Sequence, residues 1–292
     1  MSAHTIPGQA SRTPEPRVRE PGVIATPLSD REFEEFRRFI FDRAGIHLSV
    51  VKKALVAGRL ARRLRELGLG SYGAYLQLLR SAVDLDEVQV AIDLLTTNET
   101  YFFREIGHFE YLRDHILPQV SRAQPFRVWS AASSSGEEAY SIAMLLADRI
   151  GASSWEVFGS DISAQVLERA RAAVYPLQRT EFVPEGYMRR FCLKGVGAQD
   201  GTFLVDRPLR ERVSFNHVNL NGVIPSALGA FDVIFLRNVM IYFNQETKRR
   251  LIAALMPHLR RGGHLFIGHS ESLNGVTDLV RPIQPAIYVR SP

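Results

Sequence analysis

The 292-residue chain is 46% hydrophobic, which suffices for the core of one large or two modest domains and excludes a wholly disordered protein. Its single cysteine, Cys192, excludes a disulfide framework and a thiolate zinc cluster, so we expect a reducing compartment and no metal. The net charge of +5 permits an acidic partner, while the lack of a signal-peptide core and of any apolar run of ~18 residues favours a soluble cytoplasmic protein.

Two regions of different character precede the first candidate strand. Residues 1–27 are rich in Pro, Ser, Thr, Arg and Glu without apolar periodicity, so we expect a disordered tail. Residues 28–98 show helical periodicity and predict a small all-helical domain, whose first helix Ser29 or Asp30 could cap. Further helices are predicted over residues 52–67, 72–79 and 85–95.

The predicted helix over residues 52–67 is strongly basic. Between Lys52 and Arg65 there are six basic residues and no acidic one. At 100° per residue an apolar stripe faces inward, and Lys52, Arg59 and Arg63 are predicted to form an adjoining outward ridge. Such a ridge is either a solvated face or a docking surface for an acidic partner. A nucleic-acid partner is disfavoured, because no aromatic side chains interleave with the charges.

The pattern changes over residues 99–292 to alternating strands and helices, which indicates a parallel sheet covered on both faces. A helix is predicted over residues 104–119, ahead of the first strand. The predicted strands cover residues 126–132, 156–161, 231–237 and 264–269.

Strand-like pieces at residues 202–205 and 212–215 interrupt the alternation after a glycine-rich turn. We expect them to form a small antiparallel insertion, a β-subdomain over about residues 192–216. A last strand at residues 286–290 could pair antiparallel at the edge of the main sheet.

A tight loop of small residues joins the first predicted strand to a helix whose first turn carries Glu137 and Glu138. Such a loop ordinarily presents N–H groups and a helix N-terminus to phosphate, which two carboxylates would repel. The loop also has one glycine, Gly136, where the dinucleotide fingerprint has three. Because the two acids suit a ligand with a positive centre, they favour S-adenosylmethionine and methyl transfer.

Polar residues also follow the other strands, at the sheet edge where ligands of open α/β sheets bind. Asp161, 25 positions after Gly136, could accept from both ribose hydroxyls, or it could cap the following helix. Asn219 could bind an adenine edge or serve a turn. Arg237 and Asn238 end a buried strand and bring two strong hydrogen-bonding groups to the same edge.

Five segments occur in the order TTNETYFFRE, VWSAASSSGEEAYSIAM, GSDIS with VLERAR, FDVIFLRNVMIYF and GHSESL. Together they resemble the CheR family, the S-adenosylmethionine-dependent glutamate methyltransferases of chemotaxis receptors, over about residues 29–289. Where that family has Cys or Ala, Thr and Pro, this chain has Ser133, Ser135 and Ala139, all small-for-small changes. The resemblance implies an α/β fold with a Rossmann-like class I methyltransferase sheet, a small N-terminal all-α domain and an antiparallel β-subdomain.

The same resemblance implies methyl transfer to receptor glutamates with S-adenosylhomocysteine as the other product. Arg104 and Tyr242 would lie nearest the transferred methyl group. Glu138 is predicted to contact the cofactor, and Glu137 to serve the helix end. The implied cofactor contacts are Asn98, Thr100, Arg104, Glu138, Asp161, Asn219, Leu220, Leu236, Arg237 and Asn238.

Partners follow from the resemblance as well. It implies docking on the cytoplasmic helical bundle of a chemoreceptor through Lys52, Arg59, Arg62 and Arg63. The glycine pair Gly195 and Gly197 favours tethering of a receptor's C-terminal peptide by strand addition, although a plain stabilising hairpin is the alternative. We expect a monomer that binds no nucleic acid and meets the membrane only through the receptor. Two rival functions stay open, namely methylation of another substrate such as nucleic acid and a non-enzymatic cofactor-binding sensor or scaffold.

Overall fold

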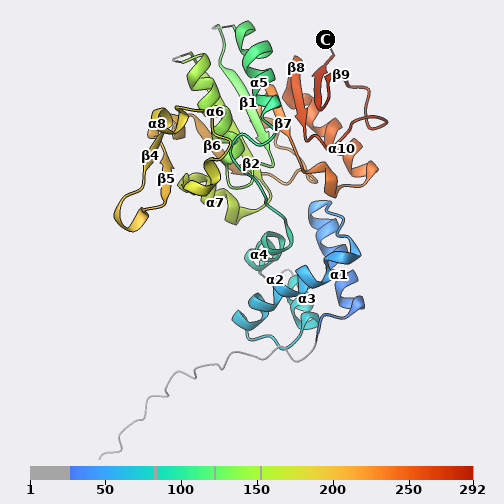
Figure 1. Cartoon of the computed structure of the whole chain (residues 1–292). Coiled ribbons are helices and arrows are strands. Elements are labelled where there is room, and N and C mark those ends of the chain that lie inside the picture. Colours follow the sequence, from blue (N-terminus) through green and yellow to red (C-terminus); the bar gives the residue numbers. More distant parts are fainter. Residues whose placement is uncertain (1–26, 82–83, 122, 152, 292) are drawn as a thin grey trace, which may run out of the picture.

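The computed structural model describes residues 27–81, 84–121, 123–151 and 153–291, so the predicted disordered tail lies outside the described residues except for Pro27. A bundle of short helices forms one part of the molecule and a sheet covered by helices forms the other (Figure 1). No helix among the described residues is long and apolar enough to cross a membrane.

The N-terminal part is the predicted all-helical bundle. Ser29 caps its first helix, and its hydroxyl and the Glu32 carboxylate form a reciprocal capping box. The expected apolar faces meet in one hydrophobic core that all four helices share. These helices are α1 (Asp30–Ala44), α2 (Lys53–Glu66), α3 (Tyr72–Ser81) and α4 (Leu85–Leu95), which confirms the predicted set.

The basic ridge predicted on α2 is wrong. Arg59 turns toward α4 and donates to the carbonyl oxygens of Leu94 (3.1 Å) and Thr96 (2.6 Å). The last carbonyl groups of a helix have no partner within the helix, so Arg59 caps the C-terminal end of α4. Arg63 pairs with Glu87, a carboxylate that is 3% exposed. Helical periodicity predicts which face of α2 a residue lies on. It cannot predict that acceptors from a neighbouring helix draw the Arg59 and Arg63 side chains toward them. Among the basic residues of α2, Arg62 and Arg65 remain exposed.

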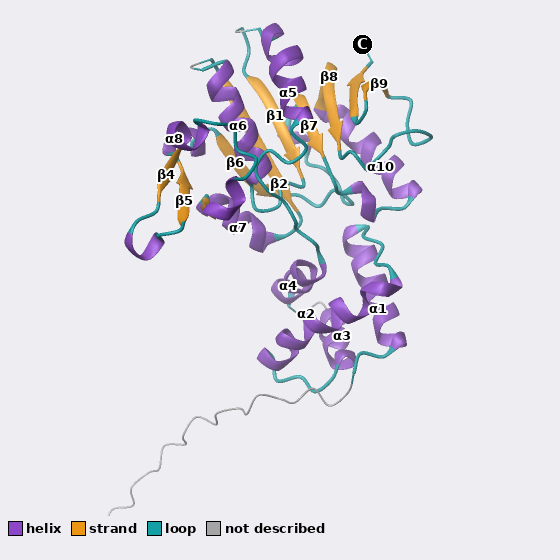
Figure 2. Cartoon of the chain, viewed as in Figure 1, coloured by secondary structure: helices purple, strands orange, loops and turns teal. Residues whose placement is uncertain are grey.

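The main sheet has the order β6-β2-β1-β7-β8-β10-β9. Figure 2 shows its strands with helices packed alongside them. The first five of these strands run parallel, whereas β10 pairs antiparallel with both β8 and β9. In sequence order the strands are β1 (Phe126–Ala131), β2 (Trp155–Asp161), β6 (Val213–His217), β7 (Phe231–Leu236), β8 (Leu259–Ile267), β9 (Val280–Gln284) and β10 (Ile287–Arg290).

Both faces of this sheet are covered, as the strand-helix alternation predicts. Successive β1 residues point to opposite faces, so Val128 belongs to one core cluster and Trp129 to the other. On the first face pack α5 (Gly107–Tyr111), α6 (Glu137–Arg149) and α7 (Ala164–Ala172), and on the second packs α10 (Gln245–Leu255).

The insertion departs from the prediction in one strand. A separate antiparallel sheet exists, with the order β3-β5-β4, from β3 (Val174–Pro176), β4 (Cys192–Lys194) and β5 (Thr202–Val205). Residues 212–215 do not join it, because β6 pairs parallel with β2 and forms an edge of the main sheet. At the opposite edge lies β9, so β10 pairs antiparallel as predicted but is not the edge strand.

The helix predicted over residues 104–119 is also shorter and less regular than expected. Phe103 and Glu105 have left-handed backbone angles, with φ of 55° and 57°, so no helix can run through them. The segment becomes helical at α5, continues through one π-helical turn, η2 (Leu112–Ile116), and ends in a 3₁₀ turn, η3 (Leu117–Gln119).

Candidate active site

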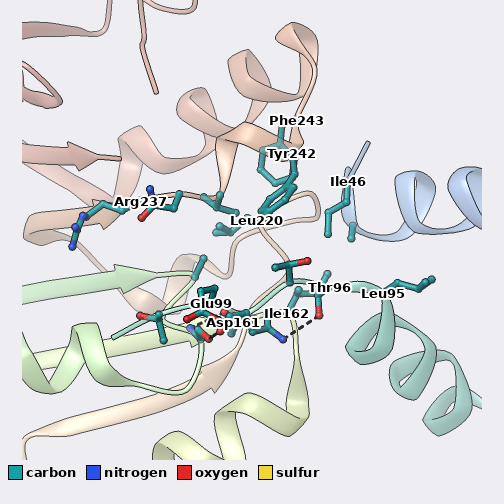
Figure 3. A pocket seen from close by; sticks show the side chains of 18 of the residues that line it. Ile46, Leu95, Thr96, Glu99, Asp161, Ile162, Leu220, Arg237, Tyr242 and Phe243 are labelled. Atoms are coloured by element: carbon teal, nitrogen blue, oxygen red, sulfur yellow. Dashed lines mark hydrogen bonds between the residues drawn. The ribbon is translucent and has the colours of Figure 1, made fainter. Parts of the chain in front are cut away.

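A pocket lies at the carboxyl ends of β1, β2 and β7, between the sheet and the helical bundle (Figure 3). This is the edge at which open α/β sheets bind ligands. The bundle contributes Ala44, Ile46, Leu48 and Lys52 to its lining. Nine of the ten predicted cofactor residues line it, namely Asn98, Thr100, Arg104, Glu138, Asp161, Asn219, Leu220, Arg237 and Asn238, and so does Tyr242.

Leu236 is the predicted residue that the structure does not bring to this pocket. Its side chain is fully buried in the core cluster between the sheet and α10, and it is not among the lining residues. Leu236 is the last residue of β7, so its side chain alternates with those of Phe235 and Arg237 and points into the sheet's second face.

The loop after β1 requires its single glycine. Gly136 has φ of 95°, a backbone conformation that residues with a side chain rarely adopt. A Cβ there would lie 2.8 Å from the Ala170 Cβ and 2.9 Å from the Tyr175 hydroxyl. Within the same loop Ala132 and Ser134 also have positive φ. The chain therefore turns sharply into α6 and brings Ser134 and Glu138 to the pocket.

Asp161 ties the loops after β1 and β2 together. Its carboxylate accepts from the backbone N–H groups of Ser134 and Ser163, each at 2.9 Å. Burial raises its pKa, which the backbone donors oppose. The cap of α7 is Ser163 itself, so the alternative in which Asp161 caps this helix is wrong. Asp161 is 6% exposed and lines the pocket.

Arg237 joins two carboxylates behind the pocket. Its guanidinium lies 2.9 Å from a Glu138 oxygen and 3.1 Å from a Glu105 oxygen, and it also donates to the Arg104 carbonyl. The other Glu138 oxygen accepts from the Ser130 hydroxyl at 2.6 Å. This network fixes the Glu138 carboxylate at the pocket with the negative charge partly compensated from behind.

Glu137 faces away from the pocket. It is 1% exposed and accepts from the Ser135 hydroxyl (2.7 Å) and from Arg179 (2.8 Å). Burial raises its pKa, and both partners oppose the shift. Of the two acids in the first turn of α6, only Glu138 can meet a ligand in this pocket.

Two cations and a phenol lie on the side of the pocket nearest the bundle. The Lys52 ammonium is 5.3 Å from the centre of the Tyr242 ring, and Arg104 donates to the Glu99 carbonyl at 2.9 Å. No carboxylate pairs with either cation in the described part of the chain. Burial raises the pKa of Tyr242 although Arg104 lowers it, so the phenol stays protonated at neutral pH. Lys52, predicted to dock a partner on an outward ridge, instead lines this pocket.

Asn219 links the pocket to the bundle. Its amide nitrogen donates to the Arg43 carbonyl at the end of α1 (2.7 Å), and its amide oxygen accepts from the Asn221 N–H (2.9 Å). A second link is the His47 N–H, which donates to the Tyr242 carbonyl at 2.8 Å. The adenine-binding and turn interpretations of Asn219 are therefore compatible, since it holds a turn and also lines the pocket.

The sequence reasoning missed Glu271 as an organising residue. Its half-buried carboxylate accepts from the N–H groups of Gly268 (2.7 Å), Asn238 (2.9 Å) and Ile241 (3.1 Å), and desolvation raises its pKa. It thus fixes the loops after β7 and β8 against each other. Its position in the matched GHSESL segment was the available signal.

Glu105, His108 and His269 bring possible metal-ligating atoms within 4.8 Å of one another. The Glu105 oxygen nearest His108 also pairs with Arg237 at 3.1 Å. A buried guanidinium neutralises that carboxylate and repels a second cation, so this cluster fits a metal poorly.

Comparison with known proteins gives one consistent family. The model of the CheR methyltransferase all-alpha domain matches residues 31–96, and that of the CheR methyltransferase SAM binding domain matches residues 98–289. A chemotaxis protein methyltransferase of Escherichia coli K12 is 44% identical over 85% of this chain and 86% of its own length. Chemotaxis protein methyltransferase 2 of Pseudomonas aeruginosa PAO1 is 41% identical over 88% and 92%.

His108 predicts a specific pH dependence of stability. It is 1% exposed, neither ring nitrogen has a hydrogen-bond partner among the described residues, and burial with help from Arg237 lowers its pKa to about 3. Above pH ~6.5 the imidazole is neutral in both the folded and the unfolded state. Below pH ~6.5 only the unfolded state binds the proton, so the free energy of unfolding falls as the pH drops toward 3. Between pH 6.5 and 5 this costs about 2 kcal/mol.

The His108→Phe variant should lack this component. Chemical unfolding at several pH values should show that wild type loses about 2 kcal/mol more than the variant between pH 6.5 and 5. Phenylalanine suits the site, because His108 already packs edge-on against Phe266. The exposed His115, changed to Gln, serves as the control and should keep the wild-type slope. Equal slopes for wild type and His108→Phe would contradict the assignment.

Proposed function

The chain belongs to the CheR methyltransferase family, and from this premise we propose that it esterifies glutamate side chains of chemoreceptors with the methyl group of S-adenosylmethionine. The family and the named relatives support S-adenosylmethionine-dependent methylation of chemoreceptors. Glutamate as the acceptor is the finer step. One observation carries it: the pocket places two cations, which pair with no carboxylate among the described residues, beside a set of acids, and this suits an anionic acceptor and a cationic donor.

The pocket residues fit this cofactor. Asp161 and Glu138 offer carboxylate oxygens for the ribose hydroxyls and the ammonium group, and Asn219 offers an amide. The apolar Leu220, Ile162 and Phe243 supply a surface for the adenine ring. When bound, the cofactor supplies an electrophilic methyl group on a sulfonium. We assign cofactor contacts to the predicted lining residues and leave out Leu236.

The acceptor needs orientation more than activation. A glutamate carboxylate with an ordinary pKa of ~4.3 is ionised at neutral pH, so no general base is required. Arg104 and Lys52 attract the carboxylate, and the neutral Tyr242 hydroxyl can donate to it. Transfer would join a carboxylate oxygen to the methyl carbon and leave the electron pair of the broken bond on the sulfur, with no proton to remove. We propose Arg104 and Tyr242 as the residues closest to this transfer.

The two parts of the molecule divide the work in this proposal. Residues 28–98 form the receptor-docking domain and residues 99–292 the methyltransferase domain, with the small sheet inserted in the latter. On α2 the exposed Arg62 stays a proposed docking residue and the exposed Arg65 joins it. Arg59 and Arg63 are left out, because both are engaged with α4. Arg62 and Arg65 lie on the helix whose N-cap residue, Lys52, lines the pocket.

The small sheet offers a second contact. In the described part of the chain its edge strand β4 pairs with β5 alone. Leu193 within β4 is 52% exposed, and Val196 just after it is 77% exposed. Gly195 cannot be replaced without strain, because a Cβ would lie 2.0 Å from the Gln199 carbonyl oxygen, and Gly197 has φ of 60°. We propose that the two glycines shape this edge for a receptor's C-terminal peptide, which would add as a further strand.

Methyl-labelled cofactor tests the function directly. Incubation with receptor-bearing membranes should place label on the receptor, and mild base should release it, because carboxyl methyl esters hydrolyse readily. Base-stable label on receptor would contradict glutamate as the acceptor. Label on nucleic acid would favour the first rival, and cofactor binding without any transfer would favour the scaffold.

The same assay tests docking. Changing both Arg62 and Arg65 to Glu should lower the rate of receptor methylation about tenfold at low salt, with a weaker salt dependence than wild type and unchanged cofactor affinity. The control changes Arg261 and Arg281, exposed near the opposite end of the sheet, to Glu and should methylate normally.

A receptor without its C-terminal peptide should be methylated more slowly only at low receptor concentration, since a tether acts by effective concentration.

Asp161→Asn should weaken cofactor binding about tenfold or more, because a carboxylate that accepts from charged or hydroxyl donors binds more strongly than an amide. Calorimetry measures the affinity. Asp93→Asn is a matched control, since Asp93 also accepts from two backbone N–H groups at the start of α7, those of Ala164 (3.1 Å) and Gln165 (3.3 Å), but does not line the pocket. Equal affinities in the two variants would refute the ribose assignment.

A further inference from the structure

The small sheet packs against the outside of the two loops that line the pocket. One loop, residues 97–104, contributes Asn98, Thr100 and Arg104 to the lining. The other, residues 132–138, contributes Ser134 and Glu138. Neither loop contains regular secondary structure before α6 begins, and both contain residues with positive φ. Their positions therefore depend on what contacts them from outside.

Arg179 contacts both loops at once. It lies in the short helix η4 (Leu177–Thr180), which directly follows β3. One guanidinium nitrogen donates to the Thr100 carbonyl at 2.6 Å and to the Glu137 carboxylate at 2.8 Å. Thr100 is 8% exposed and lines the pocket, while Glu137 opens α6 directly beside Glu138. The bond to a buried carboxylate is charge-assisted and so holds the guanidinium in place.

Aromatic side chains of the small sheet reinforce this contact. Phe102, fully buried, meets Tyr175 edge-on at 5.0 Å and Phe203 at 5.5 Å between ring centres. The Tyr175 hydroxyl donates to the Ser135 carbonyl at 2.7 Å. Tyr175 and Phe203 face each other across the β3-β5 pair. The small sheet thus holds the 97–104 loop through Phe102 and the 132–138 loop through Ser135.

We propose that Arg179 is a positioning residue for cofactor binding and that the small sheet preorganises the pocket through it. This inference rests on the proposed function, in which the pocket binds S-adenosylmethionine. Arg179 itself is not among the residues that line the pocket, so its effect acts through the Thr100 carbonyl and the first turn of α6. Without Arg179, binding of the ligand must itself order the 97–104 loop, and the free energy that this ordering costs lowers the affinity.

Removing Arg179 alone would also leave the buried Glu137 carboxylate without the cation that pairs with it among the described residues, which destabilises the fold. The experiment therefore uses the Glu137→Gln background, where that charge is absent. Arg179→Met in this background should change the thermal unfolding temperature little, and should weaken the binding of S-adenosylmethionine about tenfold relative to Glu137→Gln, as expected for loss of one charge-assisted hydrogen bond. Calorimetry on the full chain gives the affinities.

The controls separate the possible outcomes. Arg189→Met, at an exposed arginine in α8 (Tyr187–Phe191), should leave affinity and unfolding temperature as in wild type. If Arg179→Met/Glu137→Gln binds the cofactor as tightly as Glu137→Gln, Arg179 has a merely structural role and the inference is overturned. A wild-type protein that binds no S-adenosylmethionine would instead refute the proposed function.

Discussion

The active site depends on one buried cation. The Arg237 side chain is 2% exposed, and a guanidinium so far from water is tolerable only if carboxylates surround it. Glu138 reaches it from α6 and Glu105 from the loop before α5, so two separate stretches of chain must converge on the end of β7. Their convergence explains the left-handed backbone of Glu105 and Asn238, with φ of 57° at each. Strain of this kind persists where surrounding contacts over-determine it.

The helical bundle completes the site rather than merely accompanying it. Through the Arg43 carbonyl and the His47 N–H it is bonded to Asn219 and to the Tyr242 backbone, and Lys52 lies over the Tyr242 ring. Any partner that α2 recruits through Arg62 and Arg65 is thereby brought to a helix that Lys52, a lining residue of the pocket, directly precedes. In the proposed function, docking and delivery of the acceptor are properties of one rigid element.

Features encoded locally could be predicted from the sequence. Helix α4 has the expected bounds because its apolar period and its Asp84 cap lie within a dozen residues, and β7 is an unmistakable buried run. Asp161 and Gly136 could be paired because loops after neighbouring parallel strands share one edge. What failed depended on distant partners: Arg59 and Arg63 face inward because α4 supplies acceptors, and β6 joins the main sheet because β2 offers it an edge.

The charges at the pocket also bear on turnover. In the proposed function, Arg104 and Lys52 attract a receptor carboxylate, whereas its methyl ester would carry no charge, so the product would lose the electrostatic attraction that held the substrate. A strong ion pair would stabilise the ground state and slow transfer, since only interactions stronger in the transition state accelerate it. Here both cations are held by neutral groups, Arg104 by the Glu99 carbonyl and Lys52 by the Tyr242 ring. The two cations are thus positioned without being neutralised. Both side chains are half-buried, so water weakens their electrostatic attraction to the acceptor.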